Sequence, residues 1–366
     1  MSIGAYIHIP FCLTKCGYCS FFSLPFSQAT INNFASVLLQ EIDCFKQNYR
    51  FQPDTVYLGG GTPSLLSSDQ IKAIIDALEP VEGAEITLEA NPVQLTSEWL
   101  KILVKTKVNR LSLGVQTMNN HNLKSLGRKH TSQSIPDRIK LCRDNGFENI
   151  SLDLLYGLPA SNSEQVKADL DQYIALNPEH ISAYLLSIEN HVPLYYWQNM
   201  LPDETEAEKQ YNTIYEMLSA AGWEHYEISN FAKAGFSGKH NLHYWQGDEF
   251  IGLGAGASGY IGKSHYKRPD DLLLWQHSVE KKDITYKVEK ETLAQQKADF
   301  IIMQLRLMRG LDLQLYKERF GSEFVSDYNR TIEKFIASGH LEVKEGFICL
   351  TQKAWFVSNS ILQEFV

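Results

Sequence analysis

Short apolar runs alternate with longer segments of helical periodicity through the first part of the chain. The runs are rich in Val, Ile and Leu, a composition that is typical of strands. We expect strands at residues 5–9, 55–58, 86–89, 110–115, 150–155 and 181–187, with a weaker candidate at 225–228. Between these runs apolar residues recur at spacings of three and four, which predicts helices at 31–49, 68–78, 97–105 and 134–145.

Six strand–helix units in sequence favour parallel strands joined by right-handed crossovers. Such units build either an open doubly wound sheet or a closed or partial barrel, and the pattern alone does not separate these two folds. Functional-looking residues follow the ends of many different strands rather than gathering at one switch point, which favours a barrel. The sequence therefore predicts an α/β fold with a partial (β/α)6-type TIM barrel core.

The chain divides into three predicted regions. Residues 1–230 form the barrel core, and residues 231–290 are interpreted as a loop-rich connection, because they are rich in Gly, His, Tyr and Trp and less regular. Residues 291–366 are predicted to form a mostly helical, winged-helix-like domain, with helices at 294–309, 313–320 and 331–337 and a hairpin at 340–350. Its acidic and basic residues nearly balance, so we expect this domain to pack or to bind a partner rather than DNA.

Composition and charge narrow the class of protein. The net charge of -9 argues against nucleic-acid binding, which needs clustered Lys and Arg. With 44% hydrophobic and 21% charged residues, the chain has the composition of an ordinary globular protein. Its apolar stretches fall far below the roughly 20 residues that cross a bilayer. The N-terminus lacks a basic region followed by a long apolar segment, so we expect a cytoplasmic protein.

Three of the six cysteines crowd into the segment Cys12-Leu-Thr-Lys-Cys16-Gly-Tyr-Cys19, directly after the first predicted strand. The other three are scattered through apolar segments, which is typical of buried structural thiols and not of a disulfide framework. A cubane cluster has four irons, so three thiolates leave one iron free to bind an exchangeable ligand. The spacing therefore favours a [4Fe-4S] cluster, whose open iron can chelate the amino and carboxylate groups of a ligand such as S-adenosylmethionine (SAM).

Three other interpretations of this cysteine segment are considered. A structural zinc site needs a fourth ligand, and the nearest candidate, His8, lies inside the predicted strand. A redox pair fits the C-x-x-C spacing of Cys16 and Cys19, yet gives the third thiol no role. Chance clustering of buried cysteines is disfavoured by the polar neighbours in the segment.

The spacing Cys-x3-Cys-x-aromatic-Cys resembles that of the radical SAM superfamily. Four further segments are similar to the oxygen-independent coproporphyrinogen III oxidase group, and the resemblance covers nearly the entire chain, including the C-terminal domain. These segments begin at Tyr6 (YIHIPFC), Gly59 (GGGTP), Leu113 (LGVQ) and Asp153 (DLLYGLP). The resemblance implies one [4Fe-4S] cluster on Cys12, Cys16 and Cys19 and a bound SAM.

The resemblance also implies which residues surround SAM. The glycine-rich segment after the second strand, with Gly60, Gly61 and Thr62, corresponds to the segment whose backbone binds the SAM amino group, although a tight turn explains these glycines equally well. Polar residues that end or follow strands are implied to line the same cavity: Glu89, Gln116, Arg128 and Asp153. Tyr6 and Tyr18 match aromatic positions near SAM, and packing is an equally good explanation for both.

One departure from the oxidases narrows the resemblance. The oxidases carry a further cysteine two residues beyond the third, where this chain has Phe21. Phe21, together with the segment His240-Asn241-Leu-His243-Tyr244-Trp245, is similar to the haem chaperone subfamily of the same group. The resemblance implies haem as a further ligand, with His240 as its iron ligand and His243 as an alternative, because a proximal His is a common haem ligand.

The leading hypothesis is thus a haem chaperone that binds haem, SAM and one cluster and transfers haem to acceptor proteins, such as respiratory or other haem proteins, including those at the membrane. An oxygen-independent coproporphyrinogen III oxidase is the alternative, which Phe21 disfavours. A structural or regulatory winged-helix protein without a cluster is the third class. The run Gly252 to Gly259 is not interpreted as a dinucleotide loop, because no strand and helix frame it; by the resemblance, it turns close to SAM or the porphyrin.

Overall fold

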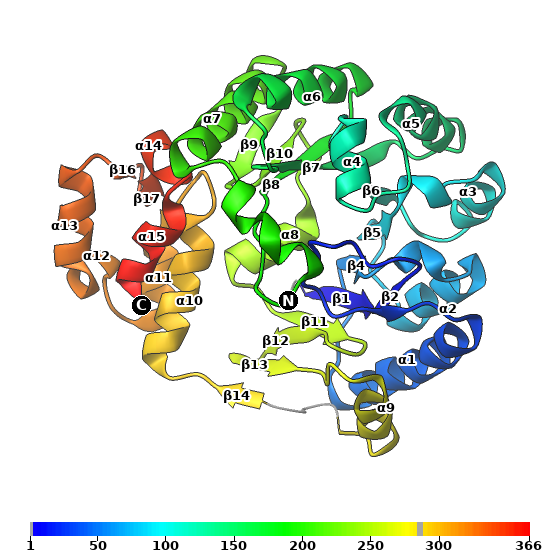
Figure 1. Cartoon of the computed structure of the whole chain (residues 1–366). Helices are drawn as coiled ribbons and strands as arrows, with labels where there is room; N and C mark the ends of the chain where they lie inside the picture. Colours follow the sequence, from blue (N-terminus) through cyan, green and yellow to red (C-terminus); the bar gives the residue numbers. More distant parts are fainter. Residues whose placement is uncertain (1–2, 284–287) are drawn as a thin grey trace.

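A twelve-stranded sheet forms the centre of the computed structural model, which describes residues 3–283 and 288–366 (Figure 1). Six consecutive parallel strands make up its middle, in the order in which they occur in the chain. These strands are β1 (Gly4–Ile9), β4 (Thr55–Gly60), β5 (Glu85–Ala90), β6 (Arg110–Gln116), β7 (Asn149–Tyr156) and β8 (His180–Leu185). Each lies within two residues of a predicted run at both ends, so the predicted strand pattern is confirmed.

Helices cover the outer side of these strands and form an arc around the curved sheet in Figure 1. They are α1 (Gln28–Asn48), α2 (Ser68–Leu78), α3 (Ser97–Leu103), α4 (Asn120–Ser125), α5 (Ile135–Asp144), α6 (Ser163–Leu176) and α7 (Glu204–Ala220), with short 3-10 turns η1 (Pro63–Leu65), η2 (Pro92–Gln94), η3 (Ser132–Ser134) and η4 (Pro193–Met200). The sheet does not close on itself, because β1 and β8 pair with other strands at their outer edges. The predicted partial barrel is therefore confirmed.

The parallel strands alternate between an apolar and a polar side. The apolar side packs into the main hydrophobic core, for example through Ile7, Leu58 and Leu113. The polar side faces the interior of the barrel, where many of its residues are buried and bonded across strands. Examples of these buried polar residues are His8, Thr55, Thr87, Arg110, Ser112, Ser151, His180 and Ser182.

The predicted loop-rich connection at 231–290 instead contains regular elements. The structure has β10 (Asn230–Ala232), α8 (Lys239–Gln246), β11 (Phe250–Leu253), β12 (Ser258–Ile261), β13 (Ser264–Lys267) and α9 (Leu272–Glu280) here. Glycine occurs in these strands because neighbouring atoms leave no room for a side chain. A Cβ at Gly252 would lie 1.9 Å from the Ser258 carbonyl oxygen, and one at Gly259 would lie 2.3 Å from the Tyr266 ring. Residues 284–287 of this predicted region lie outside the described residues.

These added strands extend the sheet at both edges. β11 pairs parallel with β1, followed by antiparallel β12, β13 and β14 (Val288–Lys290); β10 and β9 (Glu224–Glu227) follow β8 at the opposite edge. No helix in the part of the chain that the structure describes is long and apolar enough to cross a membrane.

The C-terminal part has its own apolar core around Ile301, Tyr316 and Ile348. Its elements are α10 (Leu293–Leu305), β15 (Leu311–Asp312), α11 (Leu313–Phe320), α12 (Phe324–Asp327), α13 (Asn329–Ala337), β16 (Leu341–Lys344), β17 (Phe347–Leu350), α14 (Gln352–Trp355), α15 (Ser358–Leu362) and η5 (Gln363–Phe365). The predicted helices and hairpin are present, although α10 ends at Leu305 and not at residue 309. Glu345 and Gly346 both have positive φ (50° and 88°), as the tight hairpin turn requires. The domain boundaries at 230 and 290 stay predictions.

Candidate functional site

The cysteine segment is a loop closed at its base by a short parallel strand pair. β2 (Phe11–Cys12) pairs with β3 (Leu24–Pro25), the Leu24 amide donates to the Pro10 carbonyl at 2.6 Å, and the Phe26 amide donates to the Cys12 carbonyl at 3.0 Å. Because β2 follows β1 directly, the loop begins at the carboxyl end of the barrel strands. In TIM barrels, active sites lie at this end.

Hydrogen bonds within the cysteine loop, and one from η4, fix its conformation. The Cys19 amide donates to the Cys16 carbonyl at 3.2 Å, which turns the backbone between these two residues. Lys15 Nζ donates to the Phe21 carbonyl at 3.0 Å. The Leu194 amide of η4 donates to the Gly17 carbonyl at 3.0 Å, and a Cβ at Gly17 would lie 2.7 Å from Leu194 Cγ. The loop is therefore packed against the barrel rather than projecting from it.

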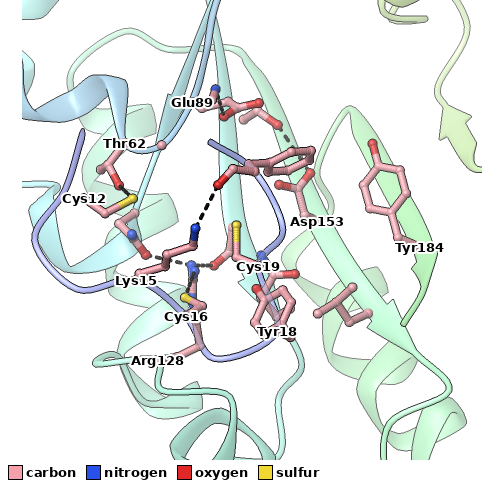
Figure 2. Close-up of a pocket in the computed structure, with 18 of the residues that line it drawn as sticks. Cys12, Lys15, Cys16, Tyr18, Cys19, Thr62, Glu89, Arg128, Asp153 and Tyr184 are labelled. Atoms are coloured by element: carbon pink, nitrogen blue, oxygen red, sulfur yellow. Dashed lines mark hydrogen bonds between the residues drawn. The ribbon is translucent and has the colours of Figure 1, made fainter. Parts of the chain in front are cut away.

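Cys12, Cys16 and Cys19 all line one cavity of about 410 Å³ (Figure 2). None forms a disulfide. The Thr62 hydroxyl lies 3.7 Å from Cys12 Sγ, and Arg128 Nη1 lies 3.6 Å from Cys16 Sγ. Burial raises the pKa of Cys19, and the neighbouring Cys16 and Cys12 add to this effect, against a backbone hydrogen bond near Phe21 that lowers it. Three thiols that share one space fit a metal cluster with three protein ligands.

His8 is turned away from this cluster space. Its Nε2 lies 3.0 Å from the Phe22 carbonyl oxygen and its Nδ1 lies 2.9 Å from the Tyr6 hydroxyl. Both ring nitrogens are therefore engaged, and His8 does not line the cavity. This geometry disfavours the zinc interpretation, in which His8 would supply the fourth ligand.

The glycine-rich turn after β4 packs against β1 and the base of the cysteine loop. Gly60 has a φ of 107°, and a Cβ there would lie 2.6 Å from the His8 ring. A Cβ at Gly61 would lie 2.7 Å from the Phe11 carbonyl oxygen. Only glycine fits these positions, and Thr62 is thereby brought beside Cys12. Gly60, Gly61 and Thr62 all line the cavity.

Two carboxylates, Glu89 at the end of β5 and Asp153 on β7, line the opposite wall of the cavity (Figure 2). Burial, with repulsion from Asp153, raises the pKa of Glu89 to about 7. Burial raises the pKa of Asp153 to about 6, although Arg110 opposes this shift. Carboxyl groups with pKa values this close to neutrality can either accept or donate hydrogen bonds. Such a pair suits a ligand that carries hydroxyl groups, as ribose does.

Arg128 and Gln116 complete the predicted set on β6 and the segment that follows it. Arg128 Nη2 donates to Asn91 Oδ1 at 2.7 Å and to the Gly114 carbonyl oxygen, so its guanidinium is held beside Cys16. Gln116 has a φ of 73°, unusual for a residue other than glycine, and the register of β6 against β7 shifts just before it. This irregularity directs Gln116 to the cavity wall, where strained residues often serve a ligand.

Tyr18 lines the cavity, but Tyr6 and His240 do not. His240 is 2% exposed and lies beside Thr55, at the beginning of β4 and hence at the amino end of the barrel strands. Its Nδ1 lies 2.8 Å from Thr55 Oγ1 and its Nε2 lies 2.8 Å from the Tyr244 hydroxyl. Burial lowers the pKa of His240 to about 3, so the ring is neutral. Both ring nitrogens of His240 are thus hydrogen-bonded in this structure, and its role as a haem ligand stays a prediction.

His243 is equally engaged. Its Nδ1 lies 3.0 Å from Asp248 Oδ2 and its Nε2 lies 2.8 Å from Asp54 Oδ1. Although burial lowers the pKa of His243, these acidic partners outweigh it and raise the pKa overall. The glycine run from Gly252 to Gly259 also lies outside the cavity lining; a Cβ at Gly254 would lie 2.4 Å from the His8 carbonyl oxygen, so the run packs against β1.

Sequence reasoning missed several residues of the site, among them Arg110 and Tyr57. Arg110 is 2% exposed, its Nη1 lies 3.5 Å from Thr87 Oγ1, and its charge acts on both cavity carboxylates. Tyr57 lines the cavity and donates to Glu89. For Arg110, the sequence signal that could have found it is the alternation along β6. Every second residue there is polar or glycine: Arg110, Ser112, Gly114 and Gln116.

Three large side chains that line the cavity are also exposed, and we call them the rim of the cavity. Phe21 is 65% exposed and Leu185 is 42% exposed, and both line the cavity. Tyr184 beside them is also 42% exposed. Large apolar side chains that remain exposed around a cavity are typical of a surface that binds a ligand or another protein.

The fold, the three-cysteine loop and a match to the radical SAM superfamily model over residues 6–172 define a radical SAM protein. The model of the HemN C-terminal domain matches residues 292–357. The heme chaperone HemW of Lactococcus lactis is 34% identical over 99% of this chain and 97% of its own length, and that of Bacillus subtilis is 33% identical over 99% of both. The chain belongs to the HemW family.

A solved structure shows the same fold. Coproporphyrinogen III oxidase (HemN) from Escherichia coli, a radical SAM enzyme, matches with a TM-score of 0.85 over 100% of this chain and 90% of that chain. At 21% identity this likeness concerns the fold alone. Membership of the radical SAM superfamily implies SAM and a [4Fe-4S] cluster.

Proposed function

We propose that this protein is a haem chaperone that binds haem, SAM and one [4Fe-4S] cluster and transfers haem to acceptor proteins. The name shared by its full-length relatives supports this function. The observation that carries it is the meeting of Cys12, Cys16 and Cys19 at one cavity whose rim exposes Phe21 where the oxidases have a further cysteine. The oxidase alternative has less support, since the full-length relatives of 33–34% identity are named haem chaperones and the solved oxidase is 21% identical.

The residues around the cavity have distinct proposed roles. Cys12, Cys16 and Cys19 would hold the cluster through their thiolates, and the bound cluster would supply the electron needed for reductive chemistry on SAM. Arg128 would place a positive charge beside the cluster through its contact with the Cys16 sulfur. Glu89 and Asp153 bind hydroxyl groups of SAM, and the turn at Gly60 to Thr62 lets the ligand approach the backbone.

Haem is proposed to bind at the apolar rim of the cavity. Its macrocycle is flat and apolar, and Phe21, Tyr184 and Leu185 offer an exposed surface of matching character beside the cluster. His240 and His243 are not included in this proposed haem site, because their ring nitrogens are already hydrogen-bonded.

The test uses anaerobically reconstituted protein, which is titrated with haem with and without SAM and then mixed with apomyoglobin as the acceptor. We expect saturable haem binding followed by transfer to apomyoglobin. Incubation with SAM, a reductant and coproporphyrinogen III should yield no protoporphyrinogen. Absence of haem binding, or rapid formation of protoporphyrinogen, would overturn the proposal.

Variants of the rim locate the haem. Phe21→Asp is expected to weaken haem binding by about tenfold or more. The bound macrocycle would cover the Asp carboxylate, and burying that charge costs free energy. Leu13→Asp is the matched control, since Leu13 lies on the same loop and is 61% exposed but does not line the cavity. Equal effects of the two changes would place haem elsewhere.

A further inference from the structure

Three potential metal ligands that the proposed function does not use converge away from the cysteine cavity. His265 lies on β13, Glu291 lies between β14 and α10, and Asp299 lies on α10. His265 Nε2 lies 3.0 Å from Glu291 Oε1 and 3.8 Å from Asp299 Oδ2. One potential ligand atom from each residue lies within 4.8 Å of the other two.

Basic side chains make few ion pairs with the two carboxylates. Glu291 and Asp299 each offer a carboxylate oxygen within 4.8 Å of the other and of a ring nitrogen of His265. Arg319 acts only at longer range: its guanidinium donates to the Gly247 carbonyl at 3.0 Å and to the Tyr260 hydroxyl at 2.9 Å. Among the described residues, His265 is the group within ion-pair distance of both carboxylates. A single imidazole therefore faces two acidic side chains.

The geometry also provides orientation and access for an ion. The Tyr260 ring packs on His265 with centroids 4.6 Å apart, which orients the imidazole. The Glu291 side chain is 8% exposed, whereas His265 and Asp299 are 31% and 43% exposed, so one side of the cluster is open to water. A small cavity is lined by all three residues together with Tyr260 and Arg319.

We propose that His265, Glu291 and Asp299 bind one divalent metal cation of the Mn²⁺ type, with water in the remaining positions. One imidazole and two carboxylates form a nitrogen–oxygen donor set, which suits Mn²⁺ better than the thiolate-preferring ions. The ion would neutralise the two carboxylates and link β13 of the main sheet to α10, the first helix of the HemN C-terminal domain match. This site is independent of the proposed haem and SAM functions.

The test probe is Mn²⁺, chosen because the cysteine loop competes poorly for it. Holoprotein with its cluster is titrated with Mn²⁺, and free Mn²⁺ is followed by electron paramagnetic resonance. We expect one bound ion per chain and a higher midpoint of thermal unfolding. His265→Ala and Asp299→Asn should each lower the affinity by at least about tenfold, the lower end of what loss of outer-shell partners costs.

Two further variants keep the experiment decisive. Glu291→Gln has nearly the same shape as the parent and should also lose binding while the cluster content and the circular dichroism spectrum stay unchanged. His277→Ala is the matched control, because His277 is an exposed imidazole 3.7 Å from Glu280 on α9. No binding of Mn²⁺ up to millimolar concentration, or binding that the three ligand variants leave unchanged, would overturn the proposal.

Discussion

Tyr57 on β4 donates a hydrogen bond of 2.8 Å to Glu89 Oε1 on the neighbouring strand β5. The other carboxylate oxygen of Glu89 accepts from the Gly60 amide at 3.2 Å, so the phenol and the glycine-rich turn hold this side chain together. Yet the pKa of Glu89 is still raised to about 7, because burial and Asp153 outweigh these two bonds. Ionisation of Glu89 is therefore unfavourable in the ligand-free cavity, and a ligand that donates hydrogen bonds to Glu89 would favour it.

This cost makes stability depend on pH. The folded-state pKa of about 7 exceeds the ordinary value of 4.5, so between these values the folded state binds more protons than the unfolded state. The free energy of unfolding should therefore fall as the pH rises from about 4.5 to about 7, and each unit of pKa difference is worth about 1.4 kcal/mol. Glu89→Gln removes this contribution, so the wild type should lose more stability than the variant between pH 5 and pH 8 by urea unfolding; parallel curves would contradict the assigned shift.

Removal of one thiolate should abolish the cluster. Cys16→Ser leaves two thiolates, too few for a stable cubane, so iron and sulfide content after anaerobic reconstitution should fall close to zero. Cys349→Ser is the matched control: Cys349 is buried and donates to the Arg309 carbonyl at 3.1 Å, a bond that serine can also make. Full iron content in Cys16→Ser would remove Cys16 from the ligand set.

The guanidinium of Arg128 should raise the reduction potential of the cluster. A positive charge 3.6 Å from Cys16 Sγ stabilises the reduced, more negative state of a cluster bound there. Arg128→Met should therefore lower the reduction potential by roughly 60 mV, equivalent to a tenfold change for a one-electron couple. Arg128→Lys retains a charge and should restore part of the shift in a spectroscopic redox titration; an unchanged potential in both variants would show that Arg128 only packs.

A buried ion pair should stabilise the packing of α1 against the segment that follows β11. Glu41 and Arg268 are both 0% exposed, with Arg268 Nε 2.6 Å from Glu41 Oε1, and Glu41 also accepts from the Gly254 amide at 2.8 Å. Glu41→Gln leaves the Arg268 charge without its partner, so we expect a loss of about 3–5 kcal/mol in the free energy of unfolding. Asp43→Asn on the exposed side of the same helix is the control, and comparable losses in both would argue against a special role for the pair.

Local patterns were sufficient for the barrel strands and for the cysteine loop. Apolar runs located the strands because these strands pack one side into the core, and the spacing of Cys12, Cys16 and Cys19 needed no long-range information. The strands around Gly252 and Gly259 were missed because glycine is required there by close packing between neighbouring strands, which appears only after the strands pair. The cluster of His265, Glu291 and Asp299 was invisible for the same reason, since three separate elements supply it.

His240 illustrates how a local motif and its place in the fold can diverge. The motif resemblance implied a haem ligand, whereas the fold places His240 at the amino end of the strands, with the backbone amide of His240 bonded to Glu85 Oε1 at 3.1 Å. His240→Ala should therefore lower the free energy of unfolding by about 2–4 kcal/mol, because Thr55 and Tyr244 lose their buried partner. Haem affinity of the folded fraction should stay unchanged in an absorption titration. His191→Ala, a change at an exposed loop histidine, controls for nonspecific loss of an imidazole. Weaker haem binding by His240→Ala at unchanged stability would instead restore the ligand role and require α8 to rearrange when haem binds.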